Sequence, residues 1–539
     1  MKKKLLVLLL MVVPMLTFAQ EKGLDQKIDA AFQPVSNFFS NLIFFTIPIA
    51  GIDVPFVLLL LVGSALFFTI YFKFPNIFHF KTAINVVRGK YDELDQHVAG
   101  DPALAIGGDI KGTIKDESTE GEVTHFQALA TAVSGTVGNG NIAGVALAIA
   151  LGGPGATFWM VVCGFLGMST KFVECTLGVQ YRDVGEDGTV YGGPMYYISK
   201  GLKERGFETF GKIVAVIFAI FCIGGSFGGG NAAQSNQATV VLKELMGLES
   251  SGAGFWIGVV MAIVVGVIII GGIKRIASVT EKVVPFMAVL YLLACLYILG
   301  ANFSLIDDAF SLIFREAFNP TAIGVGGVIG VLLVGFKRAA FSNEAGAGSA
   351  SIAHSAVKTK YSASEGLVAL LEPFIDTVVI CTMTALVIII FNFGGDASGA
   401  TIFQYGGDGA GAVLIDGVSY EGAGITSKAF AQYIPYSNVF LTVAVVLFAV
   451  STMISWSYYG LQSWKFLFGR GKAADMTYKL LFLLFVVIGA SASMKSIWAF
   501  SDAMIFAMVF PNMVGLYFLL PVVKEQLKRY TDAIKESKA

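Results

Sequence analysis

Long runs of apolar residues, each bounded by short polar stretches, recur along the chain. Eleven runs are long enough to cross a bilayer, and they lie near residues 54–73, 126–151, 155–179, 213–240, 254–272, 283–300, 321–341, 366–392, 436–462, 478–494 and 497–521. A spanning helix needs about 20 apolar residues, and these runs do not alternate as strands do. The pattern therefore predicts an all-α polytopic membrane protein with about eleven transmembrane helices.

The distribution of Lys and Arg between successive loops tests this count. Loops on the cytoplasmic side of a bacterial membrane are enriched in these residues. With the N-terminus outside, 27 of them fall in inner loops or the tail and 6 in outer segments, and Lys337 and Arg338 are counted as inner. We therefore expect a multi-pass protein of the bacterial inner membrane with a periplasmic N-terminus and a cytoplasmic C-terminus.

The N-terminus has the pattern of a targeting segment. Lys2, Lys3 and Lys4 precede a short apolar stretch that ends near Ala19. This predicts a signal peptide over residues 1–19, or an uncleaved anchor. The remaining predicted divisions are a periplasmic segment over 20–53 with an amphipathic stretch at 28–43, an extra N-terminal span over 54–73, a cytoplasmic loop over 74–125, two repeats over 126–300 and 301–521, and a cytoplasmic tail over 522–539.

The composition supports a membrane protein and argues against a soluble or nucleic-acid-binding protein. Apolar residues make up 55% of the chain and charged residues 14%, and the mean hydropathy is +0.73. Soluble chains carry about a quarter charged residues. The net charge of -1 and the lack of a basic cluster argue against a nucleic-acid partner. The five cysteines fall inside apolar runs, without disulfide or zinc spacing, and we interpret them as packing residues.

The second apolar run is interrupted where it should be most regular. Between Thr136 and Gly144 it contains three glycines and two asparagines, and glycine destabilises a helix by about 1 kcal/mol relative to alanine. This predicts a span broken near residues 137–141, where unwound carbonyls can hold a cation and a half-helix N-terminus can hold a carboxylate. The alternative is close helix packing through small residues.

An inverted repeat would place a second break in the seventh span. Spans two to six would then correspond to spans seven to eleven. The seventh run is enriched in glycine at the corresponding place, with Gly324, Gly326, Gly327, Gly330 and Gly335. The position of the break itself is left open by the sequence.

Several strings resemble the alanine or glycine:cation symporter family of the amino acid–polyamine–organocation superfamily. They are TVGNGNIAG from Thr136, AIALGGPG from Ala148, FWM from Phe158, GPMYYI from Gly193, FSNEAG from Phe341 and SWSYYG from Ser455. The resemblance extends from about residue 50 to the end. It implies a leucine-transporter-like inverted repeat with an extra N-terminal span, and sodium-coupled import of alanine or glycine without a cofactor.

The resemblance also implies candidate site residues. The sodium ligands would be Ser134, Val137, Asn141, Ser451 and Thr452, and Asn141 is a candidate for substrate or a second ion. The substrate would be bound by Thr136, by the backbone amides of Gly138, Asn139 and Gly140, and by Phe227, Asn231, Gln234 and Trp456. For several of these residues, helix–helix packing or a hydrogen bond within their own helix is the alternative.

Charged residues inside the spans are costly and are weighed separately. Lys171 and Glu174 are three apart, which favours a local ion pair. Glu372 and Asp376 begin the eighth span, where they extend toward the inner surface or take part in proton transfer or gating. His125 and His354 near span ends are interpreted as structural.

Three other functions remain as alternatives. A proton-coupled transporter of small amino acids is the nearest, and a channel is less favoured because a repeat within one chain indicates alternating access. An enzyme is disfavoured because no catalytic or metal-binding constellation is evident. The expected partners are a small amino acid, Na⁺ and the lipid bilayer.

Overall fold

The computed structural model describes residues 24–49, 52–95, 121–185, 188–248, 250, 252–270, 272–320, 327–394, 401–406, 409 and 411–537. The predicted signal peptide and residues 96–120 of the predicted inner loop lie outside these ranges. Within them the protein is a bundle of helices with three two-stranded hairpins.

An amphipathic helix and a short hairpin precede the first apolar helix. The elements are α2 (Leu24–Ile43), β1 (Thr46–Ile49), β2 (Ile52–Pro55), α3 (Phe56–Tyr71), α4 (Pro75–Phe78), α5 (Phe80–Val87) and α6 (Asp92–Asp95). The buried Phe32 of α2 lies edge-on to Phe500, with ring centroids 5.1 Å apart. The predicted amphipathic stretch over 28–43 is therefore a helix with one face packed on the bundle.

The first predicted repeat begins with a broken helix. Its elements are α7 (His125–Thr136), η2 (Gly140–Gly144), α8 (Val145–Gly152), α9 (Gly155–Gln180), β3 (Asp183–Val184), β4 (Val190–Tyr191), α10 (Pro194–Glu204), α11 (Glu208–Phe227), η3 (Gly228–Ala232), α12 (Ala233–Met246), α13 (Ala253–Ile269) and α14 (Gly272–Ala301). α7 begins with a capping box, in which Thr124 and Gln127 satisfy each other's backbone amides.

The second predicted repeat contains a second broken helix. Its elements are η4 (Phe303–Leu305), α15 (Ile306–Phe318), α16 (Gly327–Asn343), α17 (Ala350–His354), α18 (Ser362–Ala369), α19 (Leu371–Pro373), η5 (Phe374–Cys381), α20 (Thr382–Asn392), β5 (Ala412–Ile415), β6 (Val418–Glu421), α21 (Ala423–Tyr433), α22 (Ser437–Phe468), α23 (Lys472–Ser491) and α24 (Met494–Glu536).

The helices confirm an all-α polytopic membrane protein. In the part of the chain that the structure describes, seven helices are long and apolar enough to cross a membrane, or eight if α7 and η2–α8, bent by 50° at their junction, form one span. α3 and α13 are shorter apolar helices. The expected count of eleven spans stays a prediction.

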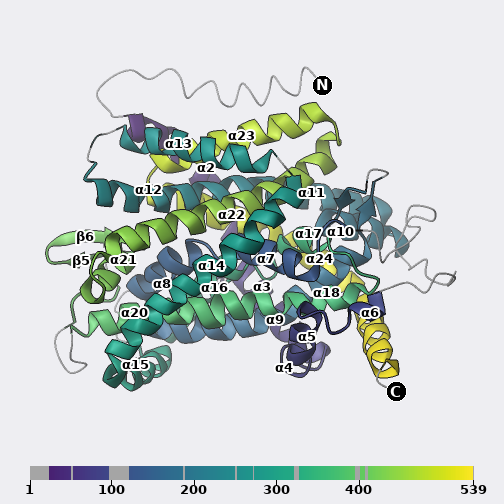
Figure 1. The fold of residues 1–539 in the computed structure, drawn as a ribbon, viewed down its shortest axis with the longest axis horizontal. Helices are drawn as coiled ribbons and strands as arrows, with labels where there is room; N and C mark the ends of the chain where they lie inside the picture. Colours follow the sequence, from purple (N-terminus) through teal and green to yellow (C-terminus); the bar gives the residue numbers. More distant parts are fainter. Residues whose placement is uncertain are drawn as a thin grey trace.

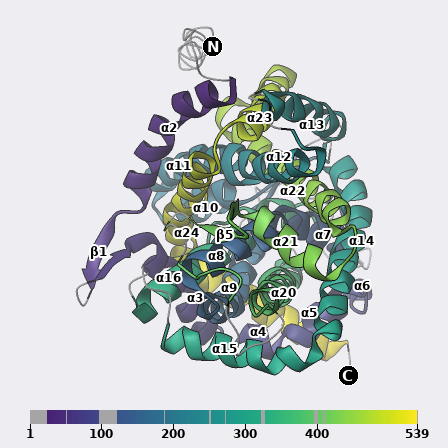
Figure 2. The same ribbon diagram turned by 90° about the vertical axis from the view of Figure 1, so that its left-hand side faces the viewer.

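The long helices lie side by side, and the connecting elements gather at the two ends of the bundle. In Figure 1, α5, α6, α10 and the C-terminus lie at the right-hand end, and the β5–β6 hairpin and α21 lie at the left-hand end. Figure 2, viewed from the latter end, shows α13 beside α23 at one edge and α15 at the opposite edge. The site described below lies between these layers.

Lys337 and Arg338 do not lie in an inner loop, and that prediction is wrong. Both belong to α16, whose helix continues to Asn343 through this polar pair. Lys337 Nζ lies 2.9 Å from Asp502 Oδ2 of α24, and the buried Arg338 guanidinium also contacts Asp502. The carboxylate compensates the cations within the bundle. Omitting these two residues leaves the excess of inner positive charge intact.

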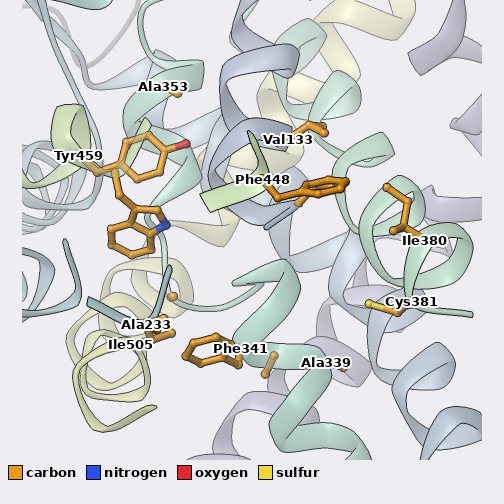
Figure 3. Packing of buried hydrophobic residues seen from close by; sticks show 14 of the residues in the cluster. Val133, Ala233, Ala339, Phe341, Ala353, Ile380, Cys381, Phe448, Tyr459 and Ile505 are labelled. Atoms are coloured by element: carbon orange, nitrogen blue, oxygen red, sulfur yellow. The ribbon is translucent and has the colours of Figure 1, made fainter. Parts of the chain in front are cut away.

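Apolar side chains and small residues fill the interior. Figure 3 shows Phe341 of α16 beside Ile505 of α24, with Ala233 of α12 close to Ile505. The five cysteines are all buried and free, consistent with their interpretation as packing residues. Gly489 of α23 is packed so closely on α12 and η3 that a Cβ there would lie 2.4 Å from the Ala232 Cα. The layers around the site therefore leave little free space.

Candidate functional site

The first break lies where the sequence predicts it. α7 ends at Thr136, residues 137–139 are not helical, and η2 resumes at Gly140. The backbone amides freed by the break donate hydrogen bonds to side-chain oxygens. Gly138 N donates to Asn141 Oδ1 at 2.9 Å, and Asn139 N donates to Gln234 Oε1 at 3.0 Å. Both amides lie at the N-terminus of a half-helix, a position where backbone N–H groups favour anionic acceptors.

A second break lies between Asn343 and Ala350, just after the predicted seventh span. Glu344, Gly346 and Gly348 have positive φ angles of 55°, 96° and 84°, and this run of left-handed residues cannot continue a helix. The sequence predicts a break within the seventh span, but α16 is continuous from Gly327 to Asn343, so the break follows that helix and the upstream glycines do not form it. Gly335 instead lets α16 approach α9, since a Cβ there would lie 2.6 Å from Ala156 O. Gly324 and Gly326 lie outside the described residues.

The two breaks meet at a buried carboxylate. Asn141 Nδ2, just after the first break, donates to Asp376 Oδ1 at 2.7 Å, and Ser342 Oγ, just before the second, donates to the same oxygen at 3.1 Å. Thr377 Oγ1 donates to Asp376 Oδ2 at 2.6 Å. These side chains are buried and, in the described part of the chain, the hydrogen-bond donors to Asp376 are neutral. We call Asn141, Ser342, Asp376 and Thr377 the aspartate cluster.

A second polar cluster joins α7, the first half of the broken helix, to α22. Ser134 Oγ donates to Ser451 O at 2.8 Å, and Thr452 Oγ1 donates to Ser134 O at 3.0 Å. Ser451 Oγ donates to Phe448 O, within its own helix, at 2.9 Å. We call Ser134, Ser451 and Thr452 the hydroxyl cluster. The structure thus brings together three of the five predicted sodium ligands, whereas Asn141 lies in the aspartate cluster.

Two of the predicted substrate residues lie beside the breaks. Gln234 Oε1 accepts a hydrogen bond from the Asn139 backbone amide, and Gln234 Nε2 donates to Gly229 O at 2.9 Å. Trp456 Nε1 donates to Glu344 Oε1 in the second break at 2.8 Å, and a Cβ at Gly230 would lie 2.1 Å from Trp456 Cγ. α22 and η3 therefore line the two breaks.

The other predicted residues make different contacts. Val137 is buried, and its amide donates to Val133 O within α7 at 2.7 Å. Thr136 Oγ1 donates to Ala132 O of its own helix at 3.3 Å. Asn231 Nδ2 donates to Phe482 O of α23 at 2.6 Å, and Phe227 stacks on Phe485 with centroids 4.5 Å apart. Asn231 and Phe227 therefore pack on α23, and their binding roles stay predictions.

Three π-helical segments converge on these clusters. η2 follows the first break, η3 carries Gly229 and Gly230, and η5 carries Asp376. A π-turn widens the helix and redirects backbone groups, and such segments are frequent at functional sites. They explain how three different helices turn polar groups toward one buried region.

A chain of buried ionisable residues lies between this region and the start of α7. Lys171 Nζ is 3.0 Å from Glu372 Oε1, and Glu372 Oε2 is 3.6 Å from His354 Nε2. His354 Nδ1 is 2.5 Å from Glu365 Oε1, and the other Glu365 oxygen contacts His125. We call these five residues the ionic chain.

The ionic chain corrects the prediction of a local Lys171–Glu174 ion pair. Lys171 pairs across helices with Glu372, while Glu174 Oε1 accepts from Asn512 Nδ2 at 2.7 Å. A residue one turn further along α9 is not the best-placed partner, because α18 and α19 pack against that face. Burial of all five side chains favours such mutual compensation.

Sequence reasoning did not identify Asp376 as the partner of Asn141, nor Ser342 and Thr377 as its neighbours. The contact between Asn141 and Asp376 joins segments 235 positions apart, and Ser342 lies 34 positions before Asp376, so no spacing within one helix reports either contact. The sequence does contain one signal, because Asp376 is an acidic residue in an apolar run. Burying its charge in a membrane is costly, so such residues usually have a function.

A family model described as the sodium:alanine symporter family matches residues 49–539. The chain is 38% identical over 482 residues to the sodium/alanine symporter AgcS of Methanococcus maripaludis, covering 89% of this chain and 95% of that protein. It is 31% identical over 429 residues to a sodium/proton-dependent alanine carrier protein of Bacillus sp. PS3, covering 78% and 91%.

Solved structures include one that is similar at low sequence identity. The crystal structure of MhsT in complex with L-phenylalanine is 15% identical, with a TM-score of 0.49, and the match covers 77% of this chain and 99% of that one.

Proposed function

Because the chain belongs to the sodium:alanine symporter family, we propose that it imports alanine, glycine or both together with Na⁺ by alternating access. The family is one of transporters and not of enzymes, as the sequence predicts. The observation that carries the proposal is the meeting of two broken helices at a buried carboxylate. Na⁺ acts here as coupling ion and cargo, and no cofactor is proposed.

The two polar clusters suit Na⁺ for the same chemical reason. A hard cation prefers carboxylate, carbonyl and hydroxyl oxygens. The hydroxyl cluster offers Ser451 O, which accepts from the Ser134 hydroxyl, and Ser134 O, which accepts from the Thr452 hydroxyl. The aspartate cluster offers the Asp376 carboxylate with the Asn141 and Ser342 side chains. In each cluster, a bound Na⁺ would take the place of hydrogen bonds that these oxygen atoms now make with neighbouring side chains.

The breaks also suit a small zwitterion. The half-helix N-terminus at Gly138–Gly140 favours a carboxylate. Asn139 Oδ1 is buried there without a hydrogen-bond partner in the described part of the chain, and an ammonium group would supply one. A Cβ at Gly138 would lie 2.4 Å from Thr452 Oγ1. Such close packing around the breaks favours a substrate with little side chain.

We place the protein in the bacterial inner membrane with its N-terminus periplasmic and its C-terminus cytoplasmic. The support is the excess of Lys and Arg in alternate loops. α5, α6, α10 and the C-terminus would then lie on the cytoplasmic side, at one end of the bundle (Figure 1).

Substrate size is tested by competition. In proteoliposomes with an inward Na⁺ gradient, we expect unlabelled alanine and glycine to reduce uptake of radiolabelled alanine, and leucine and glutamine to compete at least about tenfold more weakly. One or two added methylenes in a tight pocket change affinity by about 1–3 kcal/mol. Equal competition by glutamine would contradict the proposal of a small site.

Thr452→Val tests the hydroxyl cluster with little change in volume. It removes the hydroxyl that donates to Ser134 O, and we expect the Na⁺ concentration for half-maximal uptake to rise about tenfold, or about 1.4 kcal/mol. Ser457→Ala is the matched control, since its hydroxyl bonds only within α22, to Ile454 O. Unchanged Na⁺ dependence in Thr452→Val would reject this cluster as an ion site.

Proton coupling is the second candidate, and the ionic chain favours it. Its His and Glu side chains contact one another in sequence and can exchange protons. The relative from Bacillus sp. PS3 is named as sodium/proton-dependent. Alanine uptake that is driven by a pH gradient in the absence of Na⁺ would favour proton coupling over sodium coupling.

A further inference from the structure

A basic cavity lies at one end of the bundle, apart from both breaks. It is open to the surface, has a volume of about 1250 Å³, and is lined by the segment after α3, including Lys73 and His79, and by the last turns of α24. α3 precedes the first predicted repeat, and none of the lining residues belongs to the two polar clusters or the ionic chain. The proposed transport cycle therefore assigns it no role.

The cavity carries an excess of positive charge. Lys73, Lys524, Lys528 and Lys535 line it, together with the acids Glu525 and Asp532. Lys535 pairs with Asp532 at 3.2 Å. Among the described residues, no ion pair involves Lys73, Lys524 or Lys528, and Lys524 Nζ lies 5.7 Å from the centre of the Tyr71 ring. Three cations are thus available to an anionic ligand.

The backbone that carries Lys73 is held in an unusual conformation. Lys73 and Phe74 both have left-handed φ angles, 58° and 57°, which non-glycine residues adopt rarely and at some energetic expense. The turn is secured by Phe74 N, which donates to Thr69 O at 2.7 Å, and by Asn76 Nδ2, which donates to Phe165 O of α9 at 2.9 Å. Lys73 is therefore placed by a fixed turn and not by a flexible loop.

The rim of the cavity is apolar and exposed. Phe78, which lines the cavity, is 72% exposed, and Ile77 and Phe74 beside it are 54% and 41% exposed. The apolar helix α3 ends at Tyr71, one turn away. An exposed aromatic rim beside lysines at the end of an apolar helix is typical of the depth where lipid headgroups meet acyl chains.

We propose that this cavity binds the headgroup of an anionic glycerophospholipid from the adjacent leaflet. The phosphate would lie among Lys73, Lys524 and Lys528, and the acyl chains would lie along Ile77 and Phe78. Basic pockets between transmembrane helices bind anionic headgroups. The bound lipid would join α3, outside the repeats, to the end of α24.

The test is competitive retention of lipid by the full-length protein. Purified protein in neutral detergent is mixed with equal amounts of phosphatidylglycerol and phosphatidylcholine, and retained lipids are counted by native mass spectrometry. We expect the wild type to retain phosphatidylglycerol preferentially. In the variant K73Q/K524Q/K528Q, the ratio of retained phosphatidylglycerol to phosphatidylcholine should fall at least about tenfold. The control K274Q/K282Q/K472Q removes the same charge from other exposed positions and should keep the wild-type ratio.

Three results would overturn the proposal. The first is equal retention of both lipids by the wild type, and the second is an undiminished preference in K73Q/K524Q/K528Q. The third is displacement of phosphatidylglycerol by an equal concentration of glycerol 3-phosphate, which would indicate a site for soluble phosphates. Melting temperatures of both triple variants without added lipid are measured in parallel. We expect them to match the wild type, because the substituted lysines are exposed.

Discussion

Asp376→Asn will raise the Na⁺ concentration needed for half-maximal alanine uptake by at least about 30-fold. The substitution keeps a side chain of the same shape beside Asn141 and Ser342 but removes the negative charge. The charge pair affected is that of the Asp376 carboxylate with the proposed Na⁺. Removing one member of a buried charge pair costs about 2–5 kcal/mol, and a 30-fold change in the Na⁺ concentration corresponds to about 2 kcal/mol. Uptake is measured in proteoliposomes at fixed alanine over a series of Na⁺ concentrations.

Asp308→Asn is the matched control, because it removes one carboxylate from an exposed position of α15. It should leave the Na⁺ dependence unchanged. An unaltered Na⁺ dependence in Asp376→Asn would show that the aspartate cluster is not an ion site. A change in the pH dependence alone would assign the carboxylate to proton coupling.

Glu372→Gln will be the most destabilising single substitution in the ionic chain, with a loss of about 3–5 kcal/mol in unfolding free energy. Glu372 compensates the buried Lys171 ammonium at 3.0 Å, and the amide would leave that charge unpaired. Lys171→Met should be milder, because His354 remains beside Glu372. Unfolding is followed by titration with sodium dodecyl sulfate.

The double variant K171M/E372Q completes the cycle. Replacing both charges should recover at least half of the loss seen in Glu372→Gln, since no uncompensated lysine remains. A double variant that is no more stable than Glu372→Gln would show that the pair does not balance charge. The missing stability would then come from packing.

The helices and the first break could be predicted because their causes are local. An apolar run of about 20 residues has few alternatives to a spanning helix. Glycine and asparagine between Thr136 and Gly144 weaken the helix wherever it lies, and the structure breaks it there. Ser134, Ser451 and Thr452 were grouped by resemblance, and the structure brings them into contact.

The position of the second break and the charge partners could not be predicted because their causes are tertiary. The glycines before Lys337 marked a packing face, while the break occurs at Glu344, a residue with no intrinsic preference for positive φ. Lys171 selects Glu372 over the nearby Glu174 because α18 and α19 pack against that side of α9. Spacing along one helix carries no information about which face a neighbour covers.

The most direct test of the account is sodium-driven accumulation of alanine by the purified protein in liposomes. With Na⁺ outside and potassium inside, radiolabelled alanine should rise transiently above its external concentration. It should only equilibrate when Na⁺ is equal on both sides or replaced by choline at constant pH. Accumulation of the same size without a Na⁺ gradient would contradict sodium-coupled symport.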